Sequence, residues 1–148
     1  MALWVTNRQR KIRLDTRFLK RVGETTLAKV GVEGAECGLL LVGDRTMARL
    51  NERYRGIAGS TDVLSFPMRE GPFQSLSSAL LGDVVISAET ANRQARRVGR
   101  SLRAELAALL IHGILHLLGY DHQTPSETRK MKRLEGKLGF PFIATRPS

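Results

Sequence analysis

The sequence has little of several residue types that mark particular classes of protein. Its single cysteine, Cys37, excludes an intramolecular disulfide framework and suits a reducing cytoplasm. The longest nearly uncharged apolar run, residues 106–118, is too short to span a bilayer, and residues 1–13 have no apolar core of signal-peptide length. Aromatic residues make up only 5%, which argues against a dedicated base-stacking platform. We therefore expect a cytoplasmic protein with no membrane partner.

Acidic residues are outnumbered, and the chain is strongly basic as a result. Twenty-four Lys and Arg residues against fourteen Asp and Glu give a net charge of +10. Such a surface favours nucleic acid or an anionic membrane face, although a solvated surface with no specific partner is the alternative. Arginine predominates in several clusters, and guanidinium groups bind phosphate in bidentate fashion. The candidate RNA-binding residues are four arginines of the densest cluster: Arg93, Arg96, Arg97 and Arg100.

Length and hydrophobic periodicity predict a single α+β domain over residues 1–148. The 148 residues suffice for one core of ordinary size. Short apolar runs predict strands at residues 3–6, 37–42, 62–66 and 83–86, with Pro67 stopping the third. Together with the helices between and after them, this order predicts a mixed sheet of about four strands packed with about five helices.

Polar residues mark where these helices should begin. Asp15, Asp44, Ser87 and Ser101 each stand before a helical pattern as an N-cap. Residues 124–127 form a capping box that opens the last helix. The helix after Ser101 is apolar almost all round and should run through the core. Residues 68–80, which contain Gly, Pro and three serines, predict a mobile loop.

The most specific feature is the placing of all three histidines within eleven residues. His112 and His116 are four apart, so on a helix their imidazoles project from one face. Gly119 suits a helix C-cap, and the turn that follows can bring His122 back toward them. Three unrelated core histidines are the alternative, but burying three polar rings without a shared partner is costly. Three neutral imidazoles with an open fourth position form the ligand set of a catalytic zinc site, so we predict one Zn²⁺ per chain.

The residues around the histidines limit the chemistry. Proteases with the H-E-x-x-H motif carry their general base directly after the first ligand, where this chain has Gly113. A metallopeptidase is therefore disfavoured. Asp121 is the nearest carboxylate to the predicted ligands; it could orient a histidine, hydrogen-bond the turn or act as general base.

Three blocks of this sequence resemble the YbeY family, the bacterial rRNA-maturation endoribonucleases. The first block runs from His112 through His116 and Gly119 to His122. The second joins Asn51, Tyr54, Arg55 and Gly56 to residues 61–67, and the third is residues 81–87. The blocks follow the family's order between about residues 38 and 136, which is most of the chain.

The resemblance implies a zinc-bound endoribonuclease that prefers single strands and acts in small-subunit rRNA 3′-end maturation and ribosome quality control. Its partners would be ribosomal RNA and the small ribosomal subunit with its proteins. It also implies that Arg55 corresponds to the family's essential arginine and His112 to its essential histidine. From the sequence alone, a surface ion pair with Glu52 would be the ordinary expectation for Arg55.

Two questions stay open at this point. The nucleophile could be water activated by the metal or the RNA 2′-OH, and 2′-OH attack alone would leave a 2′,3′-cyclic phosphate. The chain could also be a non-catalytic ribosome assembly factor with a structural metal. An open coordination position argues against that alternative, because structural zinc sites are normally closed by four protein ligands.

Overall fold

Four strands form one mixed sheet at the centre of the molecule. The computed structural model describes residues 2–30, 34–68, 80–120 and 123–143. The strands are β1 (Ala2–Asn7), β2 (Glu36–Val42), β3 (Val63–Pro67) and β4 (Leu80–Ser87), in the spatial order β1-β2-β4-β3. β1, β2 and β4 are mutually parallel, and β3 pairs antiparallel with β4 at one edge. The predicted four-stranded mixed sheet is confirmed, with Pro67 as the last residue of β3. The predicted mobile loop lies almost wholly at residues 69–79, outside the described residues.

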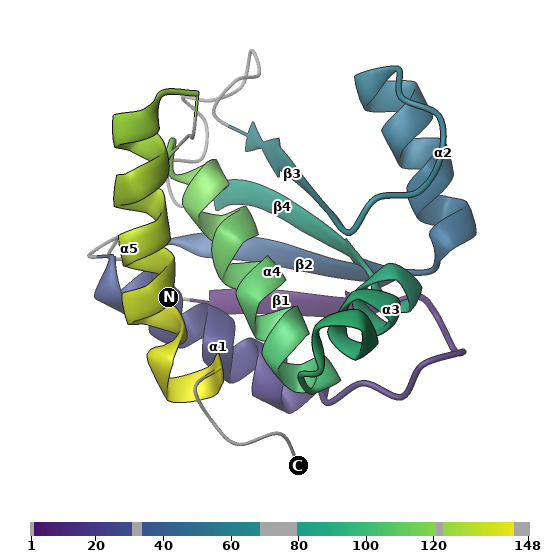
Figure 1. The fold of residues 1–148 in the computed structure, drawn as a ribbon, viewed down its shortest axis with the longest axis horizontal. Coiled ribbons are helices and arrows are strands. Elements are labelled where there is room, and N and C mark those ends of the chain that lie inside the picture. Colours follow the sequence, from purple (N-terminus) through teal and green to yellow (C-terminus); the bar gives the residue numbers. More distant parts are fainter. Residues whose placement is uncertain (1, 31–33, 69–79, 121–122, 144–148) are drawn as a thin grey trace.

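Five helices pack on this sheet, as predicted (Figure 1). Their bounds are α1 (Thr16–Lys29), α2 (Asp44–Arg55), α3 (Ala88–Val98), α4 (Leu102–Leu117) and α5 (Pro125–Ile143). No helix in the described part of the chain is both long and apolar enough to cross a membrane.

Side chains alternate between two unequal cores on the two faces of the sheet. Leu39, Leu41, Val84 and Ile86 join the larger core with α1, α4 and α5. The opposite face of the sheet carries the smaller core. α2 contributes Met47 and Leu50 to it, and the strands contribute Leu40, Val42, Leu64, Phe66 and Val85. α2 therefore lies on the other side of the sheet from the helices that follow β4.

Three of the four predicted N-caps are confirmed, and one is wrong. Asp15, Ser87 and Ser101 each accept a hydrogen bond from a backbone N–H of the first helical turn, at 3.0, 3.3 and 3.1 Å. Asp44 is not a cap: Gly43 is the N-cap of α2, and Asp44 is its first residue. The Asp44 carboxylate instead faces the start of α3, because hydroxyl and guanidinium donors converge on it there.

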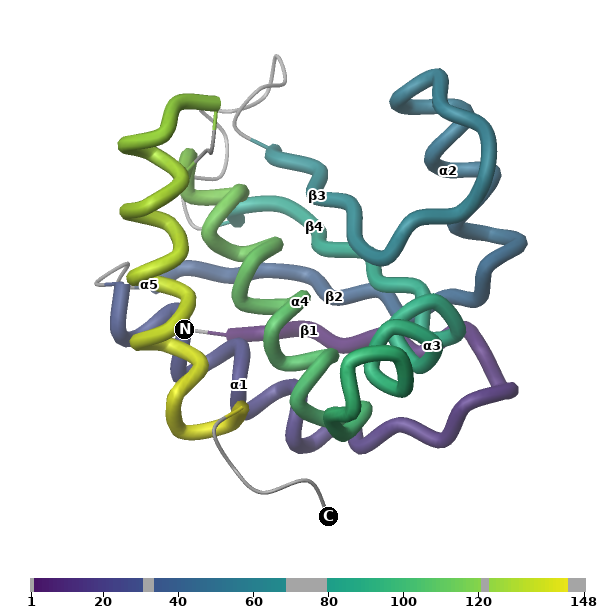
Figure 2. Tube along the Cα trace, in the orientation of Figure 1, coloured from purple at the N-terminus to yellow at the C-terminus, as the bar shows by residue number. Residues whose placement is uncertain are grey.

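Helix α4 is the central helix, as its apolar sequence predicted. It packs against α1, α3, α5, β3 and β4, and the tube trace shows α5 running alongside it (Figure 2). Most of its residues are buried, including Leu110, Ile111, Ile114 and Leu115. The two histidines that it carries are thus held on a rigid element in the interior of the fold.

Candidate metal centre and active site

His112 and His116 lie one turn apart near the end of α4, and their rings meet. The Nε2 atoms are 3.1 Å apart, and the two rings are edge to face with centroids at 4.6 Å. This is the arrangement predicted from their spacing.

The separation of these nitrogens fits a shared zinc ion. With Zn–N bonds of 2.0–2.1 Å and tetrahedral angles, two ligand nitrogens lie about 3.3 Å apart. The observed 3.1 Å is close to that separation. The two imidazoles can therefore bind one ion with little change in position.

The third predicted ligand, His122, and the predicted accessory carboxylate, Asp121, lie outside the described residues. Among the residues that are described, no three His, Cys, Asp or Glu side chains form a group that could hold a metal. The turn that leads to His122 is described as far as Tyr120. There Gly119 has φ of 96°, its N–H donates to the carbonyl of His116, and the N–H of Tyr120 donates to the carbonyl of Leu115. This pair of bonds is a Schellman motif, so the prediction that a left-handed glycine ends the helix is confirmed; Leu118 is the C-cap, and Gly119 follows it.

A carboxylate that the sequence analysis did not single out contacts His112 from α5. Oε2 of Glu135 lies 3.2 Å from Nδ1 of His112. The available signal was positional: Glu135 interrupts the inward-facing stripe of α5, between the buried residues Met131 and Leu138.

Gly113, between the two histidines, lies on the side of α4 that packs closely on the sheet. A Cβ atom at this position would lie 2.6 Å from Cγ1 of Val84 and 3.4 Å from Oγ of Ser65. Ser65 also donates a hydrogen bond of 3.1 Å to the Gly113 carbonyl. The glutamate of the H-E-x-x-H motif would have to displace the Val84 side chain of β4, because a Cβ atom at this position points into the sheet.

The histidines open onto a cleft of about 620 Å³ that three parts of the chain line. Arg55 comes from the end of α2, residues 61–65 and Pro67 from the segment leading into and along β3, and Gly119 and Tyr120 from the turn after α4. The cleft therefore brings Arg55 together with the two histidines, although they are far apart in sequence.

Arg55 is the last residue of α2 and not part of a loop. Its Nη1 donates to Oδ1 of Asn51 at 3.4 Å, one turn earlier. Asn51 is buried, and its Nδ2 donates to the carbonyl of Gly59 at 2.9 Å. Among the described residues no ion pair with Glu52 is found. The guanidinium is thus exposed at the cleft and aligned by a neutral amide, which leaves its charge available to an anion.

Asp62 is the one carboxylate among the described residues that line the cleft. Its Oδ1 accepts from the backbone N–H of Val63 at 2.7 Å and from Oγ1 of Thr61 at 3.4 Å. These local bonds shape the entry into β3. Nothing in the sequence distinguishes Asp62, because an aspartate before a strand is an ordinary turn residue.

The arginine cluster of α3 and of the turn after it lies apart from the histidines. Arg93 pairs with Asp44 at 2.8 Å, and Arg100 pairs with Glu105 near the beginning of α4. From Glu105 to His116 the helix rises about 16 Å, so this cluster and the cleft are at opposite ends of α4. Arg96 and Arg97 are exposed.

Cys37 takes no part in the site. It is fully buried in the larger core, and burial, with a smaller effect of Asp83, raises the pKa of its thiol to about 12. A thiol with that pKa is neutral at pH 7 and is neither a nucleophile nor a metal ligand.

Comparison with known proteins gives one consistent family. The family model described as "Endoribonuclease YbeY" matches residues 4–140. The endoribonuclease YbeY of Geobacter sulfurreducens is 41% identical over 137 residues, which cover 93% of this chain and 91% of that protein. The protein of the same description from Anaeromyxobacter sp. (strain Fw109-5) is 46% identical over 138 residues, or 93% of this chain and 70% of that one. The solution structure of TM1509 from Thermotoga maritima is similar with a TM-score of 0.60 and 25% identity, covering 92% of this chain and 88% of that one.

Proposed function

The chain belongs to the YbeY family of endoribonucleases, and on that premise we propose that it cleaves single-stranded RNA with the help of one bound zinc ion. Family membership makes it an RNA hydrolase. The zinc ion, the strand preference and the roles of individual residues are the proposal. The non-catalytic assembly factor is set aside, because the family is one of enzymes. The metallopeptidase is set aside because Gly113 leaves no room for its general base.

The observation that carries the proposal is the convergence of Arg55, His112 and His116 on one cleft. Two imidazoles at 3.1 Å supply neutral metal ligands, and an exposed guanidinium supplies a fixed positive charge beside them. A phosphodiester that enters such a cleft meets a donor for its non-bridging oxygens and a metal site.

We assign His112, His116 and His122 as the three zinc ligands. Because all three are neutral, a bound zinc ion would keep its +2 charge and supply Lewis acidity to water and to phosphate oxygens. Arg55 would bind the scissile phosphate and stabilise the charge that develops on it. Its bond to Asn51 directs the guanidinium group without neutralising it. The role of Asp121 stays among the three possibilities that its position in the sequence allows.

The biological substrate would be ribosomal RNA. Family membership supports a role in 3′-end maturation of small-subunit rRNA and in ribosome quality control, in the cytoplasm and in contact with the small ribosomal subunit and its proteins. The net charge of +10 supports binding to a polyanion of this kind. Arg96 and Arg97 would meet RNA that extends beyond the cleft, whereas the charges of Arg93 and Arg100 are balanced within the fold.

Cleavage of a defined single-stranded RNA by zinc-analysed protein tests this function. We expect cleavage by the wild type, its loss on chelation and its return when zinc is added. Arg55→Ala should lower kcat/KM at least tenfold, because a charge-assisted bond to the reacting phosphate is removed. His112→Ala should lose both zinc and activity.

Arg53→Ala is the matched control for Arg55. Arg53 is an exposed arginine on the same helix, and its guanidinium lies over the ring of Tyr54. Removing it takes away the same charge but leaves the cleft intact, so activity should stay within about twofold. Equal losses in the two variants would mean that Arg55 acts only through net charge. Product ends with a 2′,3′-cyclic phosphate would identify the 2′-OH as nucleophile, and their absence would identify water.

A further inference from the structure

We propose that Glu135 is a positioning residue that fixes the tautomer and ring orientation of His112 for zinc binding. The inference rests on the proposed role of His112 as a ligand. It adds a second helix, α5, to a site whose described histidines both come from α4.

The geometry places the two nitrogens of His112 against different partners. Nδ1 lies 3.2 Å from Oε2 of Glu135, and Nε2 lies 3.1 Å from Nε2 of His116. One side of the ring therefore faces a carboxylate, and the other faces the candidate metal position.

An ionised carboxylate can only accept hydrogen bonds, so Nδ1 of His112 must carry the proton in this contact. In the neutral imidazole, that tautomer leaves the lone pair on Nε2. Nε2 is the nitrogen directed toward His116, where a shared ion would bind. A negative charge behind the ring also makes the ligand nitrogen more basic.

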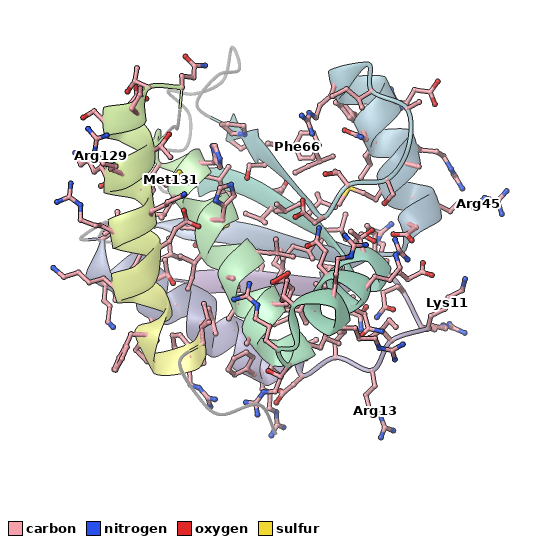
Figure 3. All side chains as sticks on the ribbon, in the orientation of Figure 1. Lys11, Arg13, Arg45, Phe66, Arg129 and Met131 are labelled. Carbon is pink, nitrogen blue, oxygen red and sulfur yellow. The ribbon has the colours of Figure 1, made fainter. Side chains whose placement is uncertain are left out.

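The position of Glu135 on α5 has no simple structural explanation. The face of α5 that packs on α4 contains Met131 and Leu138, which are 1% and 4% exposed. Figure 3 shows Met131 pointing toward α4 and Arg129 pointing away from it. Glu135 lies between these two positions with its side chain 31% exposed, so its carboxylate is only partly solvated and gains from a hydrogen-bond partner.

Among the described residues, Glu135 forms no ion pair with the lysine that stands one turn before it on α5. Lys132 stands one turn earlier, at the spacing that favours ion pairs on a helix surface. Within the described parts of the chain, however, the side chain that Glu135 contacts is His112. A carboxylate that serves only solubility or helix stability would be expected on the outer face.

Two substitutions test the inference through properties other than activity. We would measure zinc affinity by competition with a chromogenic chelator for the wild type, Glu135→Gln and Glu135→Leu. Glu135→Leu should bind zinc about 10–100-fold more weakly. Glu135→Gln should fall between the two, because its amide oxygen still accepts from Nδ1–H but carries no charge. Glu24→Gln, which makes the same change on α1, should stay within twofold of the wild type.

Long-range ¹H–¹⁵N spectra of the metal-free protein give the second readout. The wild type and Glu135→Gln should show His112 with its proton on Nδ1, and Glu135→Leu should lose this preference. A purely structural role of Glu135 would change the melting temperature but not the tautomer. Because Gln is nearly isosteric with Glu, Glu135→Gln decides the outcome if Glu135→Leu does not fold.

The result that would overturn the inference is an unchanged zinc affinity in both Glu135 variants, or a wild-type His112 protonated on Nε2. Its failure is distinguishable from failure of the proposed function. A wild type that binds no zinc would refute both, whereas a wild type that binds zinc and cleaves RNA, beside Glu135 variants that do the same, would refute the role of Glu135 alone.

Discussion

At the scale of single residues, two glycines on neighbouring helices have opposite surroundings. Gly113 lies against β4, and a Cβ there would lie 2.6 Å from Cγ1 of Val84. Gly136 lies on the outside of α5, with no atom within 4 Å of an added Cβ. Valine is branched at Cβ, so the side chain of Val84 has few alternative rotamers. A side chain is therefore disfavoured at position 113, whereas position 136 has room for one.

We therefore expect Gly113→Ala and Gly136→Ala to change stability in opposite directions. Gly113→Ala should lower the free energy of unfolding by about 1–3 kcal/mol through overpacking. Gly136→Ala should raise it by about 0.4–1 kcal/mol, because alanine restricts the unfolded chain and favours helix. Urea denaturation of the metal-free proteins measures both. A Gly113→Ala variant as stable as the wild type would show that the contact between α4 and β4 is loose enough to accept a Cβ atom there.

The site and capping residues that could be predicted from the sequence make contacts with residues only a few positions away in the chain. The spacing of His112 and His116 and the caps at Ser87 and Ser101 depend on a few adjacent positions, where helix geometry alone decides the outcome. Glu135 reaches His112 across 23 positions, and Asp44 reaches Thr90 across 46. Such contacts exist only once helices have packed together, so no local pattern contains them. Arg55 is intermediate: its family motif singled it out, but the end of α2 was needed to place it.

At the scale of elements, one carboxylate joins the starts of α2 and α3 to the segment before β3. Oδ1 of Asp44 accepts from Ser87 at 2.7 Å, from Thr90 at 2.6 Å and from Ser60 at 3.1 Å, while Oδ2 pairs with Arg93. Partial burial opposes ionisation, but these four partners outweigh it and lower the pKa of Asp44 to about 2. Ser60 stands next to the cleft residues Thr61 and Asp62, so this junction also supports one wall of the site.

The lowered pKa predicts how Asp44 contributes to acid stability. The folded pKa of about 2 lies below the ordinary value of 3.8, so the ionised form stabilises the fold above about pH 4, and this contribution is lost as the pH falls toward 2. At pH 7, Asp44→Asn should lower the free energy of unfolding by about 1 kcal/mol, since its amide oxygen can still accept from the hydroxyl groups.

Urea denaturation of the wild type and Asp44→Asn between pH 7 and pH 2.5 separates the effect of the Asp44 charge from a simple loss of packing. We expect the difference between the wild type and Asp44→Asn to shrink as the pH falls. A difference that stayed constant over that range would mean that the charge of Asp44 does not contribute. Glu24→Gln provides a control for the loss of one carboxylate elsewhere on the surface.

At the scale of the whole molecule, the order of the strands could not be predicted from the sequence, whereas the excess of positive charge could. The sequence indicated four strands, but parallel pairing of β2 with β4 joins segments separated by α2 and β3. Which strands become neighbours depends on how the helices cover each face, a property of the assembled fold. The basic surface, in contrast, follows directly from composition. Figure 3 shows Lys11 and Arg13 extending outward from the segment between β1 and α1, and Arg45 extending outward from α2.

This distribution of charge predicts that binding to RNA is mainly electrostatic. If about five phosphates are contacted, the logarithm of the affinity for single strands should fall with the logarithm of salt concentration with a slope of roughly −3.5. Fluorescence anisotropy with a labelled oligoribonucleotide and zinc-free protein measures this slope without cleavage. An affinity nearly independent of salt would argue instead for recognition through hydrogen bonds and stacking.

The central position of α4 has a consequence for how the histidine pair is lost on unfolding. Because α4 contacts three helices and two strands, it cannot detach by a local fluctuation while the rest of the domain stays folded. The histidine pair should therefore belong to the most cooperative unit of the protein, and its amides should exchange with solvent only through global unfolding. The geometry of the histidine pair and the overall fold would then be lost in a single transition.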